Sequence, residues 1–265
     1  MADETLEALL ETAIDAAHQA GRVTLRHFRT GLVPDQKSDG TPVTIADREA
    51  ERTIRLILGR RYRAHGILGE EEGETRPGAP FRWILDPLDG TRAFVRGSPI
   101  YGVMIGLERE GEPVLGVVHA PALDETVAAA RGLGCTWNGT RCRVSSVDRL
   151  HDGLLLTTDM KTPGARGAAI ARAVAAAGMA RTWGDCYGYV MVATGRAEAM
   201  IDPVMKVWDC AALLPILEEA GGTLTDWRGR RTIHGGNAVA TNGRVQGELM
   251  RILDAGTRKK KIRKA

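Results

Sequence analysis

Two aspartates close a short apolar run in the first half of the chain. Asp86 directly follows residues 82–85, and Asp89 comes three positions later. A buried strand over the run would place both carboxylates near its end, with the Leu88 carbonyl oxygen between them. Oxygen ligands of this kind suit hard divalent cations. The segment therefore predicts a cation site, although an Asp-Gly turn after a strand is also common without a metal.

The two residues after Asp89 suit a bound anion. Gly90 has no side chain, so a bound anion can approach its backbone closely, and Thr91 supplies a hydroxyl group.

Other carboxylates stand at the ends of predicted elements. Glu70 follows the apolar run at 67–69, and Asp209 stands at the start of a predicted helix. Asp47 lies three residues after Thr44, as in a capping box. Helix capping alone would account for Asp47 and Asp209 as well as a functional role does.

The elements that must position these residues alternate between helices and strands. Apolar spacing predicts helices over 4–28, 45–61, 165–178, 187–195 and 209–220, strands over 82–85, 103–107, 114–118, 126–130, 154–158 and 197–201, and loops over 31–40 and 132–143. This order predicts an α+β or layered α/β fold. Its two closely packed halves would be an N-terminal α+β half at 1–145 and a C-terminal α/β half at 146–265.

Composition limits the class of protein. The 265 residues are 43% hydrophobic and 26% charged, and no apolar stretch is long enough to cross a bilayer. The acidic N-terminus does not resemble a signal peptide, so we expect a cytoplasmic protein. The four cysteines form no C-x-x-C pair, which favours free thiols over a zinc site.

The net charge of +3 is unevenly distributed. Six lysines and arginines lie in the basic tail at 258–265, and subtracting them leaves −3 for the rest of the chain. A mildly acidic body argues against a nucleic-acid-binding protein. We expect the tail to be a solvated end.

Three motifs occur in a fixed order: Gly-Glu-Glu at 69–71, Asp-Pro-Leu-Asp-Gly-Thr at 86–91, and Trp-Asp at 208–209. In this order and spacing they resemble the inositol monophosphatase superfamily, and the resemblance extends from about residue 5 to 253. It implies an αβαβα sandwich, a metal-dependent phosphomonoesterase acting on a small soluble phosphate ester, and a homodimer.

The resemblance implies two or three magnesium ions. Glu70, Asp86 and the Leu88 carbonyl would hold one ion. Asp86, Asp89 and Asp209 would hold a second, and Glu70 would contribute to a weaker third.

The resemblance also implies catalytic roles. Thr91 and Asp47 would orient the attacking water, with Glu70 as part of the catalytic set. The amides of Gly90 and Thr91 would receive phosphate oxygens. Lys37 matches a lysine in the mobile lid of the family, and we expect metal binding to order its loop.

Within the superfamily, three segments resemble the histidinol-phosphatase branch: 89–97, 184–189 and 234–243. Asp185 stands where inositol phosphatases commonly have a small neutral residue, and Asp202 falls where the family binds the leaving alcohol. Two carboxylates suit L-histidinol, which is a cationic alcohol. A helix cap at Asp185 and a turn at Asp202 are the structural alternatives.

Other substrates and another class stay open. Inositol 1-phosphate is one alternative. Arg92 and Arg96 lie near the predicted phosphate pocket and would suit a bisphosphate such as 3′-phosphoadenosine 5′-phosphate or fructose 1,6-bisphosphate. Some members of the superfamily also act in transcription complexes, so a recruited binding partner is the competing class. The complete set of predicted metal ligands favours the enzyme.

Overall fold

The part of the chain that the structure describes contains eight α-helices, fifteen strands and two short 3₁₀-helices at Pro121–Leu123 and Leu150–Asp152. This computed structural model describes residues 4–38 and 40–255, so the basic tail at 258–265 lies outside it. The helices are α1 (Leu6–His27), α2 (Ile45–Arg61), α3 (Thr91–Val95), α4 (Gly164–Ala176), α5 (Asp185–Ala193), α6 (Val207–Ala211), α7 (Leu213–Glu219) and α8 (Gln246–Asp254).

The strands form two large sheets and a two-stranded ribbon. The ribbon pairs β1 (Asp35–Gln36) with β2 (Pro42–Val43). The first large sheet has the order β10-β9-β8-β7-β6-β5-β3-β4, and its strands are β3 (Gly66–Gly69), β4 (Gly73–Thr75), β5 (Phe81–Asp89), β6 (Gly102–Arg109), β7 (Glu112–Ala120), β8 (Glu125–Ala130), β9 (Gly134–Trp137) and β10 (Thr140–Arg141). The second has the order β12-β11-β13-β15-β14, and its strands are β11 (Leu154–Leu156), β12 (Met179–Arg181), β13 (Ala199–Asp202), β14 (Thr223–Thr225) and β15 (Ala238–Thr241).

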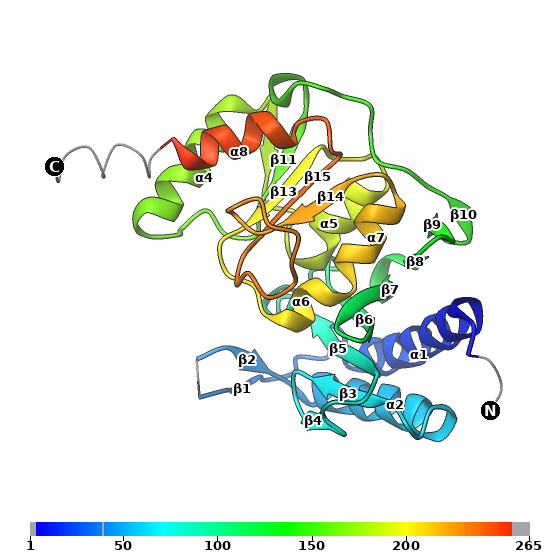
Figure 1. Cartoon of the computed structure of the whole chain (residues 1–265). Coiled ribbons are helices and arrows are strands. Elements are labelled where there is room, and N and C mark those ends of the chain that lie inside the picture. The colour runs from blue at the N-terminus through cyan, green and yellow to red at the C-terminus, as the bar shows by residue number, and fades with distance from the viewer. Residues whose placement is uncertain (1–3, 39, 256–265) are drawn as a thin grey trace, which may run out of the picture.

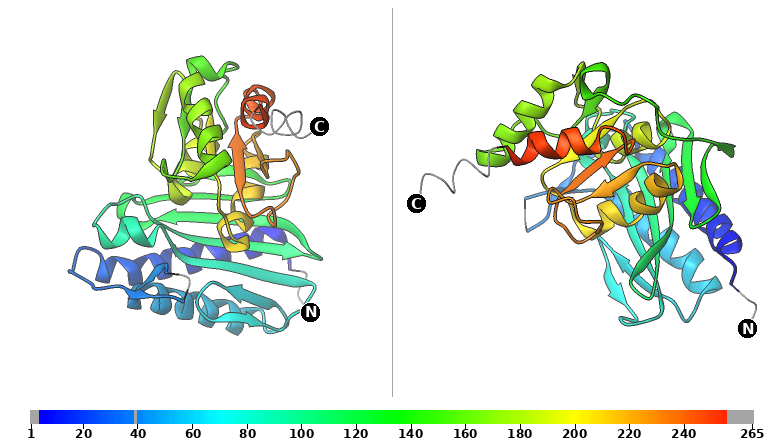
Figure 2. Two further views of the ribbon diagram at one scale, coloured as in Figure 1. Left: turned by 90° about the vertical axis from the view of Figure 1, so that its left-hand side faces the viewer. Right: turned by 45° about the horizontal axis from the view of Figure 1, so that its top comes forward.

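Helices and sheets alternate in five layers (Figures 1 and 2). Helices α1 and α2 pack on one face of the eight-stranded sheet, while α7 contacts β7 and β8 on that sheet and β14 on the other. Helix α5 lies in the same middle layer, and α4 and α8 pack together beyond the five-stranded sheet. The αβαβα architecture predicted from the motifs is therefore confirmed.

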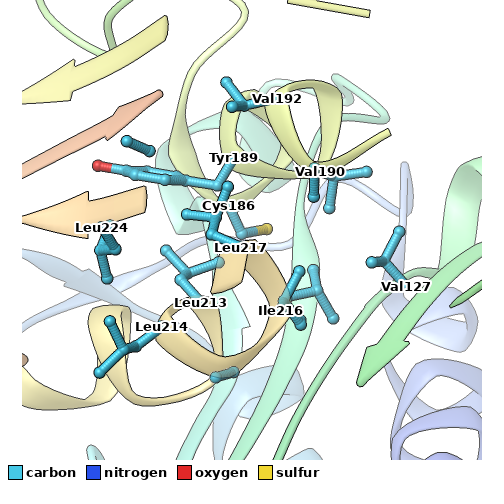
Figure 3. Close-up of a cluster of buried hydrophobic side chains, with 14 of the residues drawn as sticks. Val127, Cys186, Tyr189, Val190, Val192, Leu213, Leu214, Ile216, Leu217 and Leu224 are labelled. Atoms are coloured by element: carbon cyan, nitrogen blue, oxygen red, sulfur yellow. The ribbon is translucent and has the colours of Figure 1, made fainter. Parts of the chain in front are cut away.

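Each helix layer covers a sheet through buried apolar side chains. Leu9 and Ala13 of α1 and Ile54 of α2 are fully buried with Trp83 and Leu85 of β5. The middle layer brings Tyr189 and other α5 residues together with α7 (Figure 3). The middle cluster contains residues from both sides of position 145. The division of the chain there into two halves stays a prediction.

The predicted helix over 209–220 is wrong in one respect, because it is interrupted at Ala212. Pro215 has no backbone N–H and cannot bond the carbonyl of residue 211, so α6 ends and α7 begins there. The predicted loop over 132–143 is also wrong, because it contains β9 and β10. Asn138 and Gly139 connect these strands with positive φ angles of 48° and 77°, which is the geometry of an Asn-Gly hairpin.

Within residues 4–38 and 40–255, no helix is both long enough and apolar enough to cross a bilayer.

Candidate active site

Strand β5 carries the central pair of carboxylates near its C-terminal end. Its register with β6 shifts between Asp86 and Asp89. In a regular strand, side chains three positions apart point to opposite faces, so this irregularity allows both carboxylates to approach one point. The Leu88 amide donates to Asp86 Oδ1 at 3.1 Å. Gly90, with a φ of +85°, then turns the chain into α3.

Helix α6 brings the third carboxylate against β5. Asp209 Oδ2 accepts the backbone N–H of Lys206 at 2.7 Å, so it does take part in capping this helix. Oxygen atoms of Asp86, Asp89 and Asp209 nevertheless lie within 4.8 Å of one another. Capping and membership of the cluster are therefore compatible roles for Asp209.

Burial raises the pKa of each carboxylate in this cluster, and repulsion from neighbouring carboxylates adds to the shift. Burial, with the charges of Glu70, Asp89 and Asp209, raises the pKa of Asp86 well above its ordinary value. Burial and repulsion from Asp185 and Asp209 do the same to the pKa of Asp89. Burial raises the pKa of Asp209 to about 7. A divalent cation would relieve this repulsion, and three converging carboxylates are a donor set that fits one.

Glu70 lies at the turn after β3 and faces Lys37. Lys37 Nζ donates to Glu70 Oε1 and Glu71 Oε1, each at 2.7 Å. Burial alone would lower the pKa of Lys37, but these two carboxylates raise it overall. The charge of Glu70 acts on Asp86 and Asp209, but Glu70 is not in the group of three whose oxygens lie within 4.8 Å. Its role as a metal ligand stays a prediction.

Thr91 and Asp47 are in direct contact. Thr91 Oγ1 lies 3.0 Å from Asp47 Oδ1 and 3.2 Å from the Leu88 carbonyl oxygen. Asp47 Oδ2 accepts the amide and the hydroxyl of Thr44, at 2.8 and 2.6 Å. The capping box predicted for Thr44 is therefore present, and the second oxygen of the same carboxylate holds Thr91.

A small pocket beside the cluster contains both aspartates predicted to bind substrate. The Asp185 amide donates to Thr158 Oγ1 at 2.9 Å, and its carboxylate lies against Gly90, where an added Cβ would be 3.0 Å from Asp185 Oδ2. Gly90 therefore leaves room for this side chain. The pocket is lined by Asp89, Thr158, Asp185, Cys186, Tyr189, Asp202, Val204, Met205, Asp209 and Leu213.

Asp202 ends β13 with both carboxylate oxygens in hydrogen bonds. Oδ1 accepts the Thr158 amide at 3.1 Å and Oδ2 accepts the Tyr189 hydroxyl at 2.9 Å. Burial raises the pKa of Asp202 to about 7, although these bonds lower it. Burial raises the pKa of Asp185 to about 6, against the opposing charge of Arg92.

Sequence reasoning missed the residues that hold these carboxylates. Thr158 contacts both Asp185 and Asp202, and the amide of Cys186 donates to Asp89 Oδ2. No local pattern marks Thr158, because its partners lie 27 and 44 positions away. Tyr189 does fall within the segment at 184–189 that resembles the histidinol-phosphatase branch.

The fold and the carboxylate cluster define a phosphoric monoester hydrolase. Residues 5–258 match the model of the inositol monophosphatase family, and the chain belongs to this family.

Relatives that carry different enzyme names are similar to the chain over nearly its whole length. The histidinol-phosphatase of Chlorobaculum parvum is 42% identical, covering 94% of this chain and 98% of the relative. That of Mycobacterium tuberculosis is 40% identical, covering 93% and 98%. The inositol-1-monophosphatase of Mesorhizobium japonicum is 35% identical, covering 93% and 96%.

A solved structure has the same fold. The extragenic suppressor protein suhB of Bartonella henselae superposes with a TM-score of 0.89 at 33% identity, covering 94% of this chain and 99% of that one.

Proposed function

We propose that the protein hydrolyses L-histidinol phosphate to L-histidinol and phosphate, with magnesium, as a step of histidine biosynthesis. One observation carries the proposal. Asp185 and Asp202 line the same pocket as Asp89 and Asp209. A phosphate ester held at the carboxylate cluster would therefore place its alcohol group beside two further carboxylates.

The metal would be held by the carboxylates of β5 and α6, the Leu88 carbonyl and Glu70 from the turn after β3. Glu70, Asp86 and the Leu88 carbonyl would bind one magnesium, and Asp86, Asp89 and Asp209 a second. Glu70 would contribute to a weaker third. Magnesium supplies positive charge that neutralises phosphate oxygens and lowers the pKa of an attacking water.

The chain itself would orient that water and the phosphate. Asp47 accepts from the Thr91 hydroxyl, which leaves a Thr91 lone pair free to accept a hydrogen bond from water. Gly90 and Thr91 stand at the start of α3, where their amides would receive phosphate oxygens. Metal binding would order the loop that carries Lys37.

The substrate assignment follows from charge. Histidinol carries an ammonium group and an imidazole, and hydrogen bonds between charged groups strengthen in a buried site. Burial raises the pKa of Asp185 to about 6 against the opposing charge of Arg92, so at neutral pH Asp185 is still mainly a carboxylate that could receive the cation. Two relatives at 40% identity or above are named histidinol-phosphatases.

Inositol 1-phosphate is the second candidate, because a relative at 35% identity is an inositol-1-monophosphatase. Inositol is neutral, so it would gain little from two carboxylates. A bisphosphate would use Arg92 to read its second phosphate. We also propose a cytoplasmic homodimer, for which light scattering of the purified protein is the test of assembly.

The deciding experiment is phosphate release with magnesium from four esters: L-histidinol phosphate, myo-inositol 1-phosphate, 3′-phosphoadenosine 5′-phosphate and fructose 1,6-bisphosphate. We expect kcat/KM for histidinol phosphate to exceed the others by about 100-fold, which corresponds to roughly 2.7 kcal/mol of transition-state binding. A preference for another ester would overturn the substrate assignment. Inactivity on all four would favour a recruited binding partner.

A further inference from the structure

Helix α2 contains a fully buried carboxylate that none of the roles above uses. Glu51 is 0% exposed and lies on the face of α2 toward the turn that joins β3 to β4. Its Oε2 accepts the amide of Glu71 at 2.8 Å, and its Oε1 accepts the amide of Glu72 at 3.0 Å. One side chain thus satisfies two consecutive backbone donors of the turn.

Two neighbours hold Glu51 in this position. Arg55, one turn later on α2, donates from Nε to Glu51 Oε1 at 2.8 Å and also reaches the Gly73 carbonyl. Gly69 begins the turn on the other side, and a Cβ there would overlap the Glu51 carboxylate. Glycine at position 69 is therefore needed for Glu51 to approach the turn.

The turn braced in this way carries the acidic residues that face the site. The Glu70 amide is bound to the Leu85 carbonyl of β5 at 3.2 Å, so the backbone is fixed on the β5 side as well. Between these two anchors, the side chains of Glu70 and Glu71 reach Lys37.

We propose that Glu51 is a positioning residue, which orients the Glu70 carboxylate toward the metal cluster by fixing the Glu71 and Glu72 amides. The proposal rests on the proposed role of Glu70 as a magnesium ligand. Residues that hold a metal ligand in place typically change metal affinity or activity by about 10–100-fold when replaced. Replacing a residue with a purely structural role would instead lower the free energy of unfolding and leave the magnesium dependence of activity unchanged.

The first test is Glu51→Gln, which keeps the size of the side chain but points an NH₂ group at a backbone donor. We expect the magnesium concentration for half-maximal activity to rise by about tenfold or more, with kcat at saturating magnesium within about threefold of wild type. In metal-free protein, hydrogen exchange at the Glu71 and Glu72 amides should accelerate at least about tenfold, because each has lost or weakened its acceptor. Calorimetric titration with magnesium should give a matching loss of affinity.

Gly69→Ala breaks the same contact without altering any charge. We expect it to reproduce the magnesium shift and the faster exchange. Glu49→Gln is the matched control, since Glu49 lies on the same helix but pairs with His27. We expect it to change neither quantity.

Unchanged magnesium affinity and unchanged amide exchange in both folded variants would overturn the proposal. A fall in kcat with an unchanged magnesium concentration for half-maximal activity would also overturn it. If the wild-type protein showed no magnesium-dependent turnover, the proposed function would fail. Faster exchange of the Glu71 and Glu72 amides in Glu51→Gln would still show that Glu51 fixes this turn.

Discussion

The Thr91 hydroxyl lies 3.0 Å from Asp47 Oδ1, although 44 positions separate the two residues. The contact joins the first turn of α3, directly after the β5 carboxylates, to the first turn of α2. Asp47 therefore has one oxygen in a helix cap and the other on a hydroxyl beside the carboxylate cluster. A capping residue that is fixed in this way can hold Thr91 in one rotamer without a structural change of its own.

Replacing Thr91 by valine should affect turnover more than stability. The hydroxyl that would orient water is lost, while the shape of the side chain is kept. We expect kcat to fall by about 100-fold or more, the scale of a positioned proton acceptor. Thr53→Val removes a hydroxyl that bonds only its own helix backbone, at Glu49, and should leave kcat unchanged. Equal kcat values in the two variants would contradict the assigned role.

Asp185→Asn should lower kcat/KM for a substrate with a cationic group much more than for one without. The amide cannot pair with the cationic part of histidinol, so kcat/KM for histidinol phosphate should fall by roughly 10–100-fold, the value of a charged hydrogen bond. Hydrolysis of p-nitrophenyl phosphate, which has no cationic group, should change by less than about threefold. The exposed Asp152→Asn serves as the control. A uniform loss on both substrates would instead place Asp185 in the phosphate chemistry.

Lys37→Met should loosen the segment between α1 and α2. The ammonium group bridges that segment to Glu70 and Glu71, and the apolar replacement cannot. In metal-free buffer we expect limited proteolysis in this segment to be several times faster than in wild type. Lys161→Met, at an exposed position, should show no difference. Magnesium should slow cleavage of the wild type, and equal rates with and without metal would refute the ordering of the loop.

Features of the site that depend on residues close together in the sequence could be predicted from local patterns. The apolar run before Asp86 predicts the strand that carries Asp86 and Asp89, so the position of both residues near its end could be expected from spacing. The helix break at Pro215 and the hairpin at Asn138 also have local signals, namely the missing N–H and the Asn-Gly pair. Both signals are local, so both features can be predicted from the sequence alone.

The remaining features depend on contacts across the fold. Thr158 reaches two aspartates on different elements, and Glu51 reaches a turn 20 positions away. Helical spacing assigns Glu51 no special status, because it cannot reveal what packs against that face of α2. The register shift between Asp86 and Asp89 likewise depends on pairing with β6.

Asp202 gives a pH dependence whose sign can be stated. Its pKa rises from 3.8 to about 7 in the folded protein because of burial. Between these values the folded state keeps a proton that the unfolded state has lost, so the free energy of unfolding falls as pH rises through this window. Asp202→Asn cannot ionise and lacks this contribution.

The measurement is the Tm of wild type and of Asp202→Asn in metal-free buffer between pH 4 and 8. Because Asp185 and Asp209 also titrate and are present in both proteins, the difference between the two Tm values isolates Asp202. We expect the Tm of the variant to rise relative to that of wild type by on the order of 10 °C from pH 4 to 7, with the change nearly complete by pH 8. A difference that stays constant across this range would mean that the pKa of Asp202 in the folded protein is not raised above its unfolded value. Asp202 would then be a charged carboxylate, ready for a cationic substrate, over most of this pH range.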